Sequence, residues 1–415
     1  MRIVGAVGND GPVQTVTVVG IGADGWAGLT DAAREAIAEA EVVLGGRRQL
    51  ELVAGRTTAE PVAWPSPMLP RLVGFLDGFA GRNVVALASG DPMLHGMGGT
   101  LVRALGADRV TVLGHPSSVS LACARLGWPV DEVEVVTVVG RPLDRLRRVL
   151  ADGRRVLVLS AGAASPAEIA ALLVAAGFGA SEMTVLEQLG GPRERRVDGT
   201  AEKWEATVDP LNVVALLCHG DSGLGETAGL PDDAYRHDGQ LTKREVRAVT
   251  LAHLAPRPGE LLWDVGAGCG SIGIEWMRAH PACAAVAIES DSERAALIGA
   301  NAAALGVPGL RVVVGRAPET FSGLPTPDVV FIGGGLTREG VLPACLAALR
   351  PGGRIVANAV TLESEAVLTA AHAAHGGQLV RVSVARAGPL GEFTGWRPAM
   401  PVTIWSLTTP GTTSP

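Results

Sequence analysis

The sequence predicts an α/β protein with two domains. Apolar runs of strand length alternate with helical patterns along the whole chain, which is typical of α/β architecture. A chain of 415 residues, 47% of them hydrophobic, is too long to fold around the hydrophobic core of a single domain of typical size. One long polar, glycine-rich stretch, residues 219–240, interrupts the alternation. We therefore place the domain boundary near residue 225 and expect domains at 1–225 and 226–415.

The first domain is expected to form two smaller α/β lobes with a cleft between them. A first series of strands is predicted near residues 15–20, 84–89 and 109–113. A second series is predicted near residues 132–139, 154–159, 182–186 and 212–217. The loop LGHPSSVS, residues 113–120, lies between the two series.

The second domain is expected to form one sheet. Five strands are predicted near residues 261–266, 283–289, 310–315, 328–333 and 354–360. Two more, LVRVSVARAG (379–388) and VTIWSL (402–407), are joined by the loop GPLGEFTGWRPAMP and have no helix between them. Parallel neighbours need a crossover, so these two should pair as an antiparallel hairpin at one edge of the sheet. A seven-stranded sheet ending this way is the usual class I methyltransferase variant of the Rossmann-like fold.

The segment WDVGAGCGSIGIEW, residues 263–276, combines an apolar strand, a glycine-rich turn and an amphipathic helix. Gly266, Gly268 and Gly270 permit a sharp turn and a close approach to a ligand, at which the helix directs its N-terminal amides. Residues 268–273 also match GxGxxG, so a nicotinamide dinucleotide is the main alternative cofactor.

Two acids bear on this choice. Asp264 ends the strand before the glycines, where a carboxylate would repel a pyrophosphate but can accept hydrogen bonds from a cationic amino-acid ligand. Glu289 ends the next strand, where it can accept both hydroxyls of a ribose, and both cofactors carry a ribose. Asp264 together with the terminal hairpin therefore favours S-adenosylmethionine.

Two further motifs of the second domain allow two interpretations each. Thr242 either forms a capping box with Glu245 or also reaches the cofactor. The three glycines at 333–335 either leave space for a bulky flat ligand or form a flexible loop.

The first domain has its own glycine turn, VVGIGADG at 18–25, and a second motif, ASGDPMLHG at 88–96. In the second motif Gly90 permits a tight backbone. Asp91 can bind a ligand or cap the turn with its side chain. Ser117 and Ser118 stand at the start of a helix, where capping is their simplest role.

Taken together, VGIGADG, ASGDPMLHG and GHPSSVSLACARLG resemble the tetrapyrrole (corrin/porphyrin) methylases, whose two α/β lobes bind S-adenosylmethionine between them. LTKREVR, DVGAGCGSIGIEW, AIESD, GRAPE and FIGGG resemble the decarboxylating precorrin methyltransferases of cobalamin synthesis. The ordered set covers nearly the whole chain. It implies one S-adenosylmethionine site in each domain.

The resemblance also implies individual cofactor contacts. In the first domain they are, in addition to Gly90, Ala23, Asp91, Leu94, Ser117 and Ser118. In the second they are, in addition to Asp264, Thr242, Gly266, Ala267, Gly268, Cys269, Gly270, Glu289 and Ala317. Relatives often have aspartate where this chain has Glu289, and the longer acid should still reach a ribose diol.

The implied reaction is methylation of precorrin-6B at C5 by the first domain and at C15 by the second, with loss of the C12 acetate carboxyl as carbon dioxide, giving precorrin-8. The family indicates no general base, so the catalytic residues are unknown; orientation and exclusion of water should dominate. Arg338, Arg386 and Arg397 are candidate partners for substrate carboxylates, although a solvated surface charge explains each of them. The alternatives are an NAD(P)-dependent oxidoreductase acting on a tetrapyrrole and a tetrapyrrole carrier.

Composition limits the partners. A net charge of −7 and a pI near 5.7 argue against binding to nucleic acid or to an anionic membrane. The five cysteines form no CxxC pair, and His372 and His375 have no third ligand nearby, so we expect neither disulfides nor a metal site. The start, MRIVGAVGNDGP, lacks the apolar run of a signal peptide, which predicts a cytoplasmic protein. We expect the tail GTTSP to be disordered and the chain to form a homo-oligomer through its C-terminal domain.

Overall fold

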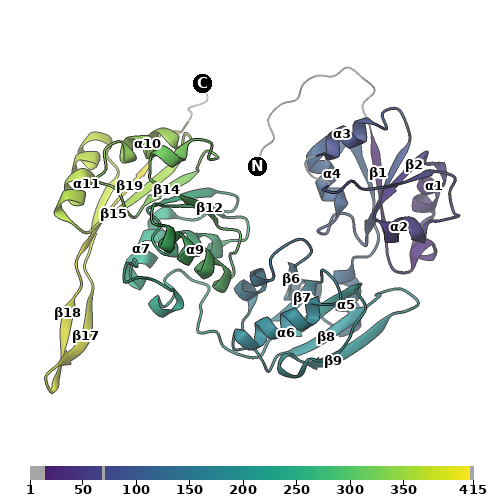
Figure 1. Ribbon diagram of the computed structural model, residues 1–415, viewed down its shortest axis with the longest axis horizontal. Coiled ribbons are helices and arrows are strands. Elements are labelled where there is room, and N and C mark those ends of the chain that lie inside the picture. Colours follow the sequence, from purple (N-terminus) through teal and green to yellow (C-terminus); the bar gives the residue numbers. More distant parts are fainter. Residues whose placement is uncertain (1–14, 68–70, 412–415) are drawn as a thin grey trace. The chain divides into compact units, whose positions relative to one another are not determined.

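The computed structural model describes residues 15–67 and 71–411 (Figure 1). The chain divides into two compact units, one comprising Met1–Arg141 and Ala151–Gly220, the other Pro142–Leu150 and Asp221–Pro415. The segment MRIVGAVGNDGP, on which the signal-peptide expectation rests, lies outside the described residues. So do residues 412–415 of the tail GTTSP, which was expected to be disordered. No helix in the described part of the chain is long and apolar enough to cross a membrane.

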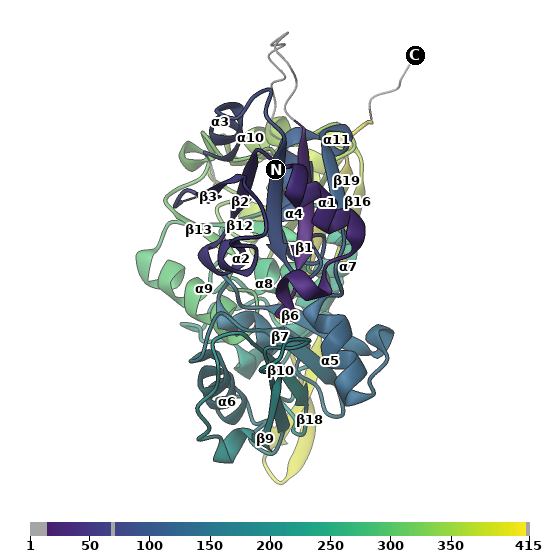
Figure 2. The same ribbon diagram turned by 90° about the vertical axis from the view of Figure 1, so that its right-hand side faces the viewer.

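The first lobe of the first unit is a parallel sheet with the strand order β3-β2-β4-β1-β5. Its elements are β1 (Val16–Ile21), α1 (Asp31–Glu39), β2 (Val42–Gly45), α2 (Arg47–Leu52), β3 (Glu60–Ala63), α3 (Leu72–Asp77), β4 (Val84–Ser89), α4 (Met97–Leu105) and β5 (Val110–Leu113). Alternate strand residues point to opposite faces, so α1 and α2 cover one face and α3 and α4 the other (Figure 2).

The second lobe is a mixed sheet with the order β6-β7-β10-β8-β9, in which only β6 and β7 run parallel. Its elements are α5 (Ser118–Leu126), β6 (Val133–Thr137), β7 (Arg155–Leu159), α6 (Ser165–Ala175), β8 (Glu182–Glu187), β9 (Arg195–Thr200) and β10 (Asn212–Leu217). Helix α5 packs its buried residues against one face of this sheet.

Three strands of the first unit were not predicted from the sequence. Strand β2 has only four residues, β3 contains a proline, and β9 is a charged strand at the sheet edge, with the sequence RRVDGT. Short length, proline and charge each weaken the strand pattern. Strands β3 and β9 lie at sheet edges, where proline and charge are tolerated, whereas β2 is a short buried strand between β3 and β4. The seven strands that were predicted for this domain are all present.

The second unit contains the expected seven-stranded sheet, in the order β13-β12-β11-β14-β15-β19-β16. Its elements are α7 (Arg244–Leu254), β11 (Leu261–Val265), α8 (Ser271–Ala279), β12 (Ala284–Glu289), α9 (Ser292–Ala304), β13 (Arg311–Val314), β14 (Val329–Ile332), α10 (Val341–Ala348), β15 (Arg354–Ala359), α11 (Leu362–His375), β16 (Gln378–Val382) and β19 (Val402–Thr408). The predicted antiparallel pairing of the last two sheet strands is confirmed. Helices α7, α8 and α9 cover one face, and α10 and α11 the other.

The segment between β16 and β19 corrects one expectation. The strand predicted at 379–388 is divided between β16 and β17 (Ala385–Leu390). Strand β17 continues into the predicted loop and pairs there with β18 (Phe393–Pro398), and the two form a ribbon that extends away from the sheet of its own domain (Figure 1). Gly391, with φ +61°, provides the left-handed residue of its tight turn. The prolines and glycines of this segment suggested a loop, but a free-standing ribbon has no neighbouring strand for them to disrupt.

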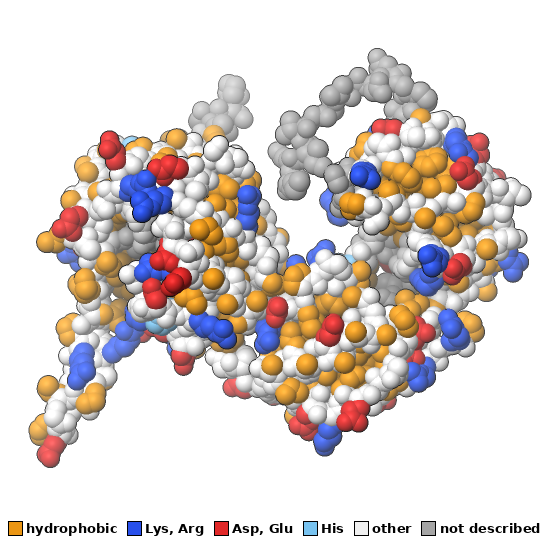
Figure 3. Space-filling model, in the orientation of Figure 1, with side chains coloured by type: hydrophobic (Ala, Val, Ile, Leu, Met, Phe, Trp, Pro, Cys, Tyr) orange, Lys and Arg blue, Asp and Glu red, His pale blue; other side chains and the backbone are white. Residues whose placement is uncertain are grey.

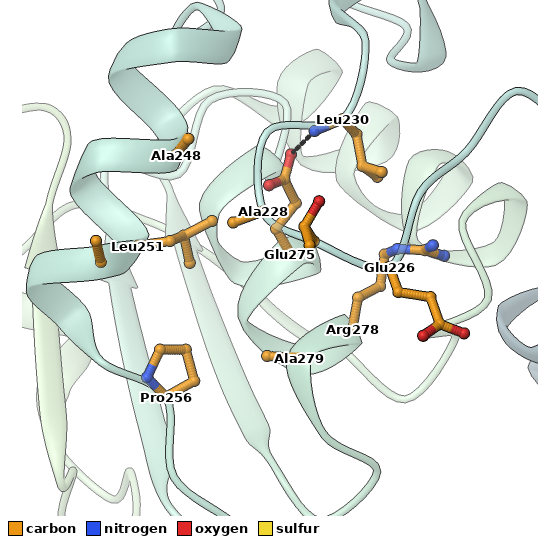
Figure 4. Close-up of a pocket in the computed structure, with 11 residues that line it drawn as sticks. Glu226, Ala228, Leu230, Ala248, Leu251, Pro256, Glu275, Arg278 and Ala279 are labelled. Carbon is orange, nitrogen blue, oxygen red and sulfur yellow. Dashed lines mark hydrogen bonds between the residues drawn. The ribbon is translucent and has the colours of Figure 1, made fainter.

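The polar stretch before α7 is held firmly in the second unit. The buried carboxylate of Glu275 on α8 accepts hydrogen bonds from the Gly229 backbone, from the Tyr235 hydroxyl and from the Arg247 guanidinium. It also accepts the backbone N–H of Leu230 (Figure 4). A cavity of about 210 Å³ lies beside this cluster. Because four donors satisfy the carboxylate, Glu275 fixes the path of the chain into α7.

Candidate functional site

The second unit has a cavity of about 390 Å³ at the carboxyl ends of its parallel strands. Four of the predicted cofactor residues line it: Gly266, Gly268, Glu289 and Ala317. The glycines at 333–335, which follow β14, form part of the same wall. In an open α/β sheet this edge is where ligands bind.

The glycine turn has the tight geometry that its sequence suggests. Gly266, Gly268 and Gly270 have φ values of +68°, +60° and +85°. A Cβ on Gly266 would lie 2.6 Å from the backbone of Gly334, so two glycine segments far apart in the sequence pack directly together. A Cβ on Gly268 would meet nothing nearer than 3.9 Å. The turn is therefore closed towards the protein and open towards the cavity.

Glu289 is buried and its carboxylate faces the turn. Its Oε2 accepts the Gly268 backbone N–H at 2.8 Å, and its Oε1 accepts the Asp291 backbone N–H at 3.0 Å. The Ser290 hydroxyl adds a longer bond to Oε1, at 3.4 Å. A carboxylate can accept about four hydrogen bonds, so these three bonds still leave it capacity to accept from a diol. The same side chain can both order the turn and bind a ligand in the cavity.

Asp264 lies one layer deeper. It is 1% exposed, and its Oδ2 accepts the backbone N–H of Gly273 at 2.9 Å, while Oδ1 has no hydrogen-bond partner among the described residues. Burial, and secondarily the nearby charge of Glu289, raise the pKa of Asp264 to about 7. Asp264 does not line the cavity. Its observed contact joins β11 to α8 beneath the turn, and its unpaired oxygen leaves one acceptor available.

The other predicted residues of this domain also lie outside the cavity wall: Thr242, Ala267, Cys269 and Gly270. The capping-box interpretation of Thr242 is wrong. The N-cap of α7 is Lys243, without a side-chain cap bond, and Glu245 pairs instead with Arg386 of β17. The helix begins one residue later than the box requires, and the Thr242 carbonyl accepts a bond from Arg247.

Several wall residues were not predicted, among them Gln240, Ser290, Arg294 and Arg316. Asp238 accepts bonds from the Gln240 backbone at 3.0 Å and the Arg294 guanidinium at 2.7 Å, and so holds both at the cavity. Arg338, a candidate for substrate carboxylates, also lines the cavity and pairs with Glu319. No motif marks Gln240 or Arg294 as wall residues, because their positions at the cavity depend on tertiary structure: Arg294 reaches Asp238 across 56 positions of sequence.

The first unit has a larger cavity of about 570 Å³, lined by both lobes. Four predicted residues line it: Ala23, Gly90, Leu94 and Ser118. Gly90 has φ +58°, and a Cβ on Gly20 of the first turn would lie 2.3 Å from the Gly90 carbonyl oxygen. The two motifs of this domain, separated by some 70 residues in the sequence, therefore pack against each other at the cavity floor.

Asp91 and Ser117 do not line this cavity, and their side chains take the simpler roles. Asp91 Oδ1 accepts the Met93 backbone N–H at 2.8 Å, which closes the turn. Ser117 is the N-cap of α5 and accepts the Ser120 backbone N–H at 3.0 Å. Both residues therefore shape the loops from which their neighbours reach the cavity.

Two unpaired polar atoms of the second lobe lie at the same cavity. Asn212 is 7% exposed and donates through Nδ2 to the Asp209 carbonyl at 2.7 Å, which fixes its amide orientation. Its Oδ1 has no partner in the described part of the chain. Among the described residues the buried Ser160 hydroxyl has no partner either, and both residues line the cavity. Buried polar atoms are rarely left unpaired, so these two fit a ligand with hydrogen-bonding edges, such as a nucleoside base.

The described residues contain no cluster of three or more His, Cys, Asp or Glu side chains suited to a metal ion. The five cysteines are buried and free. The walls of the two cavities include glycine turns, the carboxylate of Glu289, side-chain amides and arginines.

Comparison with known proteins identifies the family. Residues 15–205 match the Tetrapyrrole (Corrin/Porphyrin) Methylases, and residues 233–409 match the Precorrin methyltransferase domain. A decarboxylating precorrin-6Y C(5,15)-methyltransferase from Sinorhizobium sp is 53% identical over 397 residues, which cover 95% of this chain and 96% of that protein. The chain belongs to the decarboxylating precorrin-6Y C5,15-methyltransferases.

Shorter relatives are named for single activities. A protein from Pyrobaculum calidifontis that is named "Probable cobalt-precorrin-6B C(15)-methyltransferase (decarboxylating)" is 37% identical over 188 residues, covering 43% of this chain and 94% of that protein. A cobalt-precorrin-7 C(5)-methyltransferase from Salmonella typhimurium is 31% identical over 180 residues, covering 43% of this chain and 88% of that protein.

As a member of this precorrin-6Y C5,15-methyltransferase family, the chain is an S-adenosylmethionine-dependent, decarboxylating C-methyltransferase of cobalamin biosynthesis with a tetrapyrrole substrate. Both predicted fold types and the expected activity are thereby confirmed. The oxidoreductase and carrier alternatives are set aside.

Proposed function

We propose that each domain holds its own S-adenosylmethionine site, so that one chain binds two cofactor molecules. The supporting observation is that each unit contains a cavity of its own, built around its own glycine motif. The unpaired Asn212 and Ser160 atoms fit a cofactor in the first cavity. The open side of Gly268 and the carboxylate of Glu289 fit one in the second.

When bound, S-adenosylmethionine supplies an electrophilic methyl group. The chain's own residues bind the cofactor and the tetrapyrrole, orient them towards each other and exclude water from the site. In the second domain Glu289 would accept the ribose hydroxyls, Asp264 would support the turn that carries Gly268, and Ala317 would face the cofactor from the loop after β13. In the first domain Ala23, Leu94 and Ser118 would contact the cofactor directly, whereas Asp91 and Ser117 would act through loop shape.

We also assign C5 methylation to residues 1–225, and C15 methylation with decarboxylation to residues 226–415. The two halves match different families, and the C5 and C15 activities are named separately in shorter relatives. Methylation of an enamine-like carbon leaves the conjugated macrocycle electron-deficient, so it can accept the electron pair released as the C12 acetate loses carbon dioxide. No side chain is therefore assigned as a general base.

The two-site proposal is tested by counting ligands on the full chain. Calorimetric titration with S-adenosylhomocysteine should give two sites per wild-type chain and one in Gly268→Arg. The arginine should fill the second cavity, because a side chain at Gly268 has open space before it. Gly299→Arg, at an exposed position of α9 with nothing within 4 Å of its Cβ, is the matched control and should keep two sites. One site in the wild type would contradict the proposal.

We further propose that the chain self-associates through the ribbon β17–β18 of its C-terminal domain. Four large apolar side chains on and beside the ribbon are strongly exposed: Leu390 (67%), Phe393 (78%), Trp396 (76%) and Met400 (68%). Figure 3 shows hydrophobic side chains along this projection. A two-stranded ribbon with exposed aromatic residues is marginally stable in water, so we expect a second copy of this chain to cover it.

A further inference from the structure

The cavity of the first domain carries an uncompensated positive charge. Arg48 is the one Lys, Arg, Asp or Glu side chain among the described residues that line it. No carboxylate in the described part of the chain pairs with Arg48, and its one hydrogen bond is to a neutral group, the Ser89 hydroxyl, at 2.9 Å. Burial lowers the pKa of the Arg48 guanidinium, and no acid opposes this effect. Arginine nevertheless stays protonated in proteins, so the charge is present at neutral pH.

The side chains beside Arg48 are neutral: they bring a further hydrogen-bond donor to the cavity but no negative charge. Gln49 Nε2 donates to the same Ser89 oxygen at 2.6 Å, so two donors converge on one hydroxyl at the end of β4. Gln49, Ser89 and Trp64 line the cavity beside Arg48. A guanidinium has five N–H donors, and Arg48 uses one of them here, which leaves a fork that matches a carboxylate.

We propose that Arg48, Gln49 and Ser89 form a carboxylate-binding subsite in the cavity of the first domain. This inference rests on the proposed function of that cavity. The carboxylate can come from an acetate or propionate side chain of the tetrapyrrole or from the amino-acid end of the cofactor. A tetrapyrrole with several such side chains presents more negative charge than a cofactor that also carries a sulfonium and an ammonium group. The tetrapyrrole is therefore the source that the charge of the cavity favours.

The subsite is tested on the full chain with Arg48→Gln and Arg48→Lys. Arg47→Gln is the matched control, because Arg47 is exposed on the same turn of α2 and does not line the cavity. The measurements are the dissociation constant for S-adenosylhomocysteine, and KM and kcat for the metal-free precorrin with C5 and C15 methylation followed separately by ¹³C label from the cofactor. Loss of a charge-assisted hydrogen bond corresponds to an effect of about ten- to hundredfold.

For a tetrapyrrole carboxylate, Arg48→Gln raises KM for C5 methylation about tenfold or more and leaves kcat and cofactor affinity within about threefold. Arg48→Lys falls between Arg48→Gln and the wild type, because it keeps the charge but not the fork. The wild-type KM should also rise with ionic strength more steeply than that of Arg48→Gln, a difference that a purely structural role would not produce.

The other possible results of the Arg48 experiment are each assigned one interpretation. A loss of S-adenosylhomocysteine affinity in Arg48→Gln keeps the subsite and assigns its carboxylate to the cofactor. A rise in KM for C15 methylation instead of C5 keeps the subsite and overturns the division of labour between the domains. Unchanged KM and cofactor affinity, or equal effects of Arg47→Gln and Arg48→Gln, would overturn the subsite.

Discussion

Asp264 and Glu289 lie near the same glycine turn but have different roles, because they are buried at different depths below the cavity. Glu289 lies at the cavity surface and keeps acceptor capacity for a ligand. Asp264 is fully enclosed, so burial raises its pKa and makes a proton on it favourable in the folded state. The sequence places both at strand ends but does not reveal this difference in burial, which depends on the packing of α8 and β12 over β11.

We predict that Glu289→Ala weakens binding of S-adenosylhomocysteine to the second site by about 1.5–3 kcal/mol, or roughly ten- to 150-fold. The variant removes the acceptor for the ribose hydroxyls and the bond to the Gly268 backbone. Calorimetric titration measures the effect, with the first site as an internal reference. Glu293→Ala removes the same charge from an exposed position of α9 and should bind normally. An unchanged dissociation constant in Glu289→Ala would remove Glu289 from the site.

Asp264 predicts a pH dependence of stability. Its pKa is about 7 in the folded protein against an ordinary value of 3.8, so between these pH values the folded state binds a proton that the unfolded state lacks. The free energy of unfolding should therefore fall as pH rises from about 4 to 7 and lose this dependence above 7, a change of a few kcal/mol. Urea unfolding of wild type and Asp264→Asn across this range isolates the contribution. If the two proteins keep a constant stability difference from pH 4 to 8, Asp264 is not the titrating group.

At the scale of elements, the strongly patterned strands were predictable and the weakly patterned ones were not. Buried parallel strands such as β11 and β12 are continuous apolar runs, and their bounds were predicted to within one or two residues. β9 and β17 carry charge, proline or glycine, because each lies at an edge or outside the main sheet. The missing capping box has a similar cause: Glu245 pairs with Arg386 across 141 positions of sequence, a contact that local rules do not contain.

For the ribbon we predict that Phe393→Ser with Trp396→Ser lowers the solution mass of the protein to that of a smaller assembly. These two side chains are the most exposed apolar groups on the ribbon, and burying them against another copy would supply several kcal/mol. Size-exclusion chromatography with light scattering measures the mass. Val174→Ser, which removes an exposed apolar group from α6, should leave it unchanged. A monomeric wild type, or an unaltered mass in the double variant, would rule out this role for the ribbon.

At the scale of the whole molecule, the sequence was most informative about motif order and least informative about cavity walls. The family, the two fold types and the turn glycines followed from ordered local motifs. The contact of Gly266 with Gly334, the approach of Gln240 to the second cavity, and the convergence of Arg48 and Gln49 on Ser89 depend on tertiary structure. The proposed carboxylate subsite depends on contacts of this second kind, which explains why no sequence motif indicated Arg48.

The division of labour between the domains is the last prediction. Gly268→Arg should block the second site while leaving Asp264 in place to support the turn. A non-glycine residue at φ +60° costs about 1–2 kcal/mol, which a domain of this size should tolerate. The first domain should be unaffected, because the two units have separate cores.

Mass spectrometry of the product from the metal-free precorrin should show two added methyl groups and loss of one carbon dioxide with the wild type. With the variant it should show at most one methyl group and a retained carboxyl. If a variant that no longer binds a second S-adenosylhomocysteine still decarboxylates the substrate, the second domain does not carry out the decarboxylation.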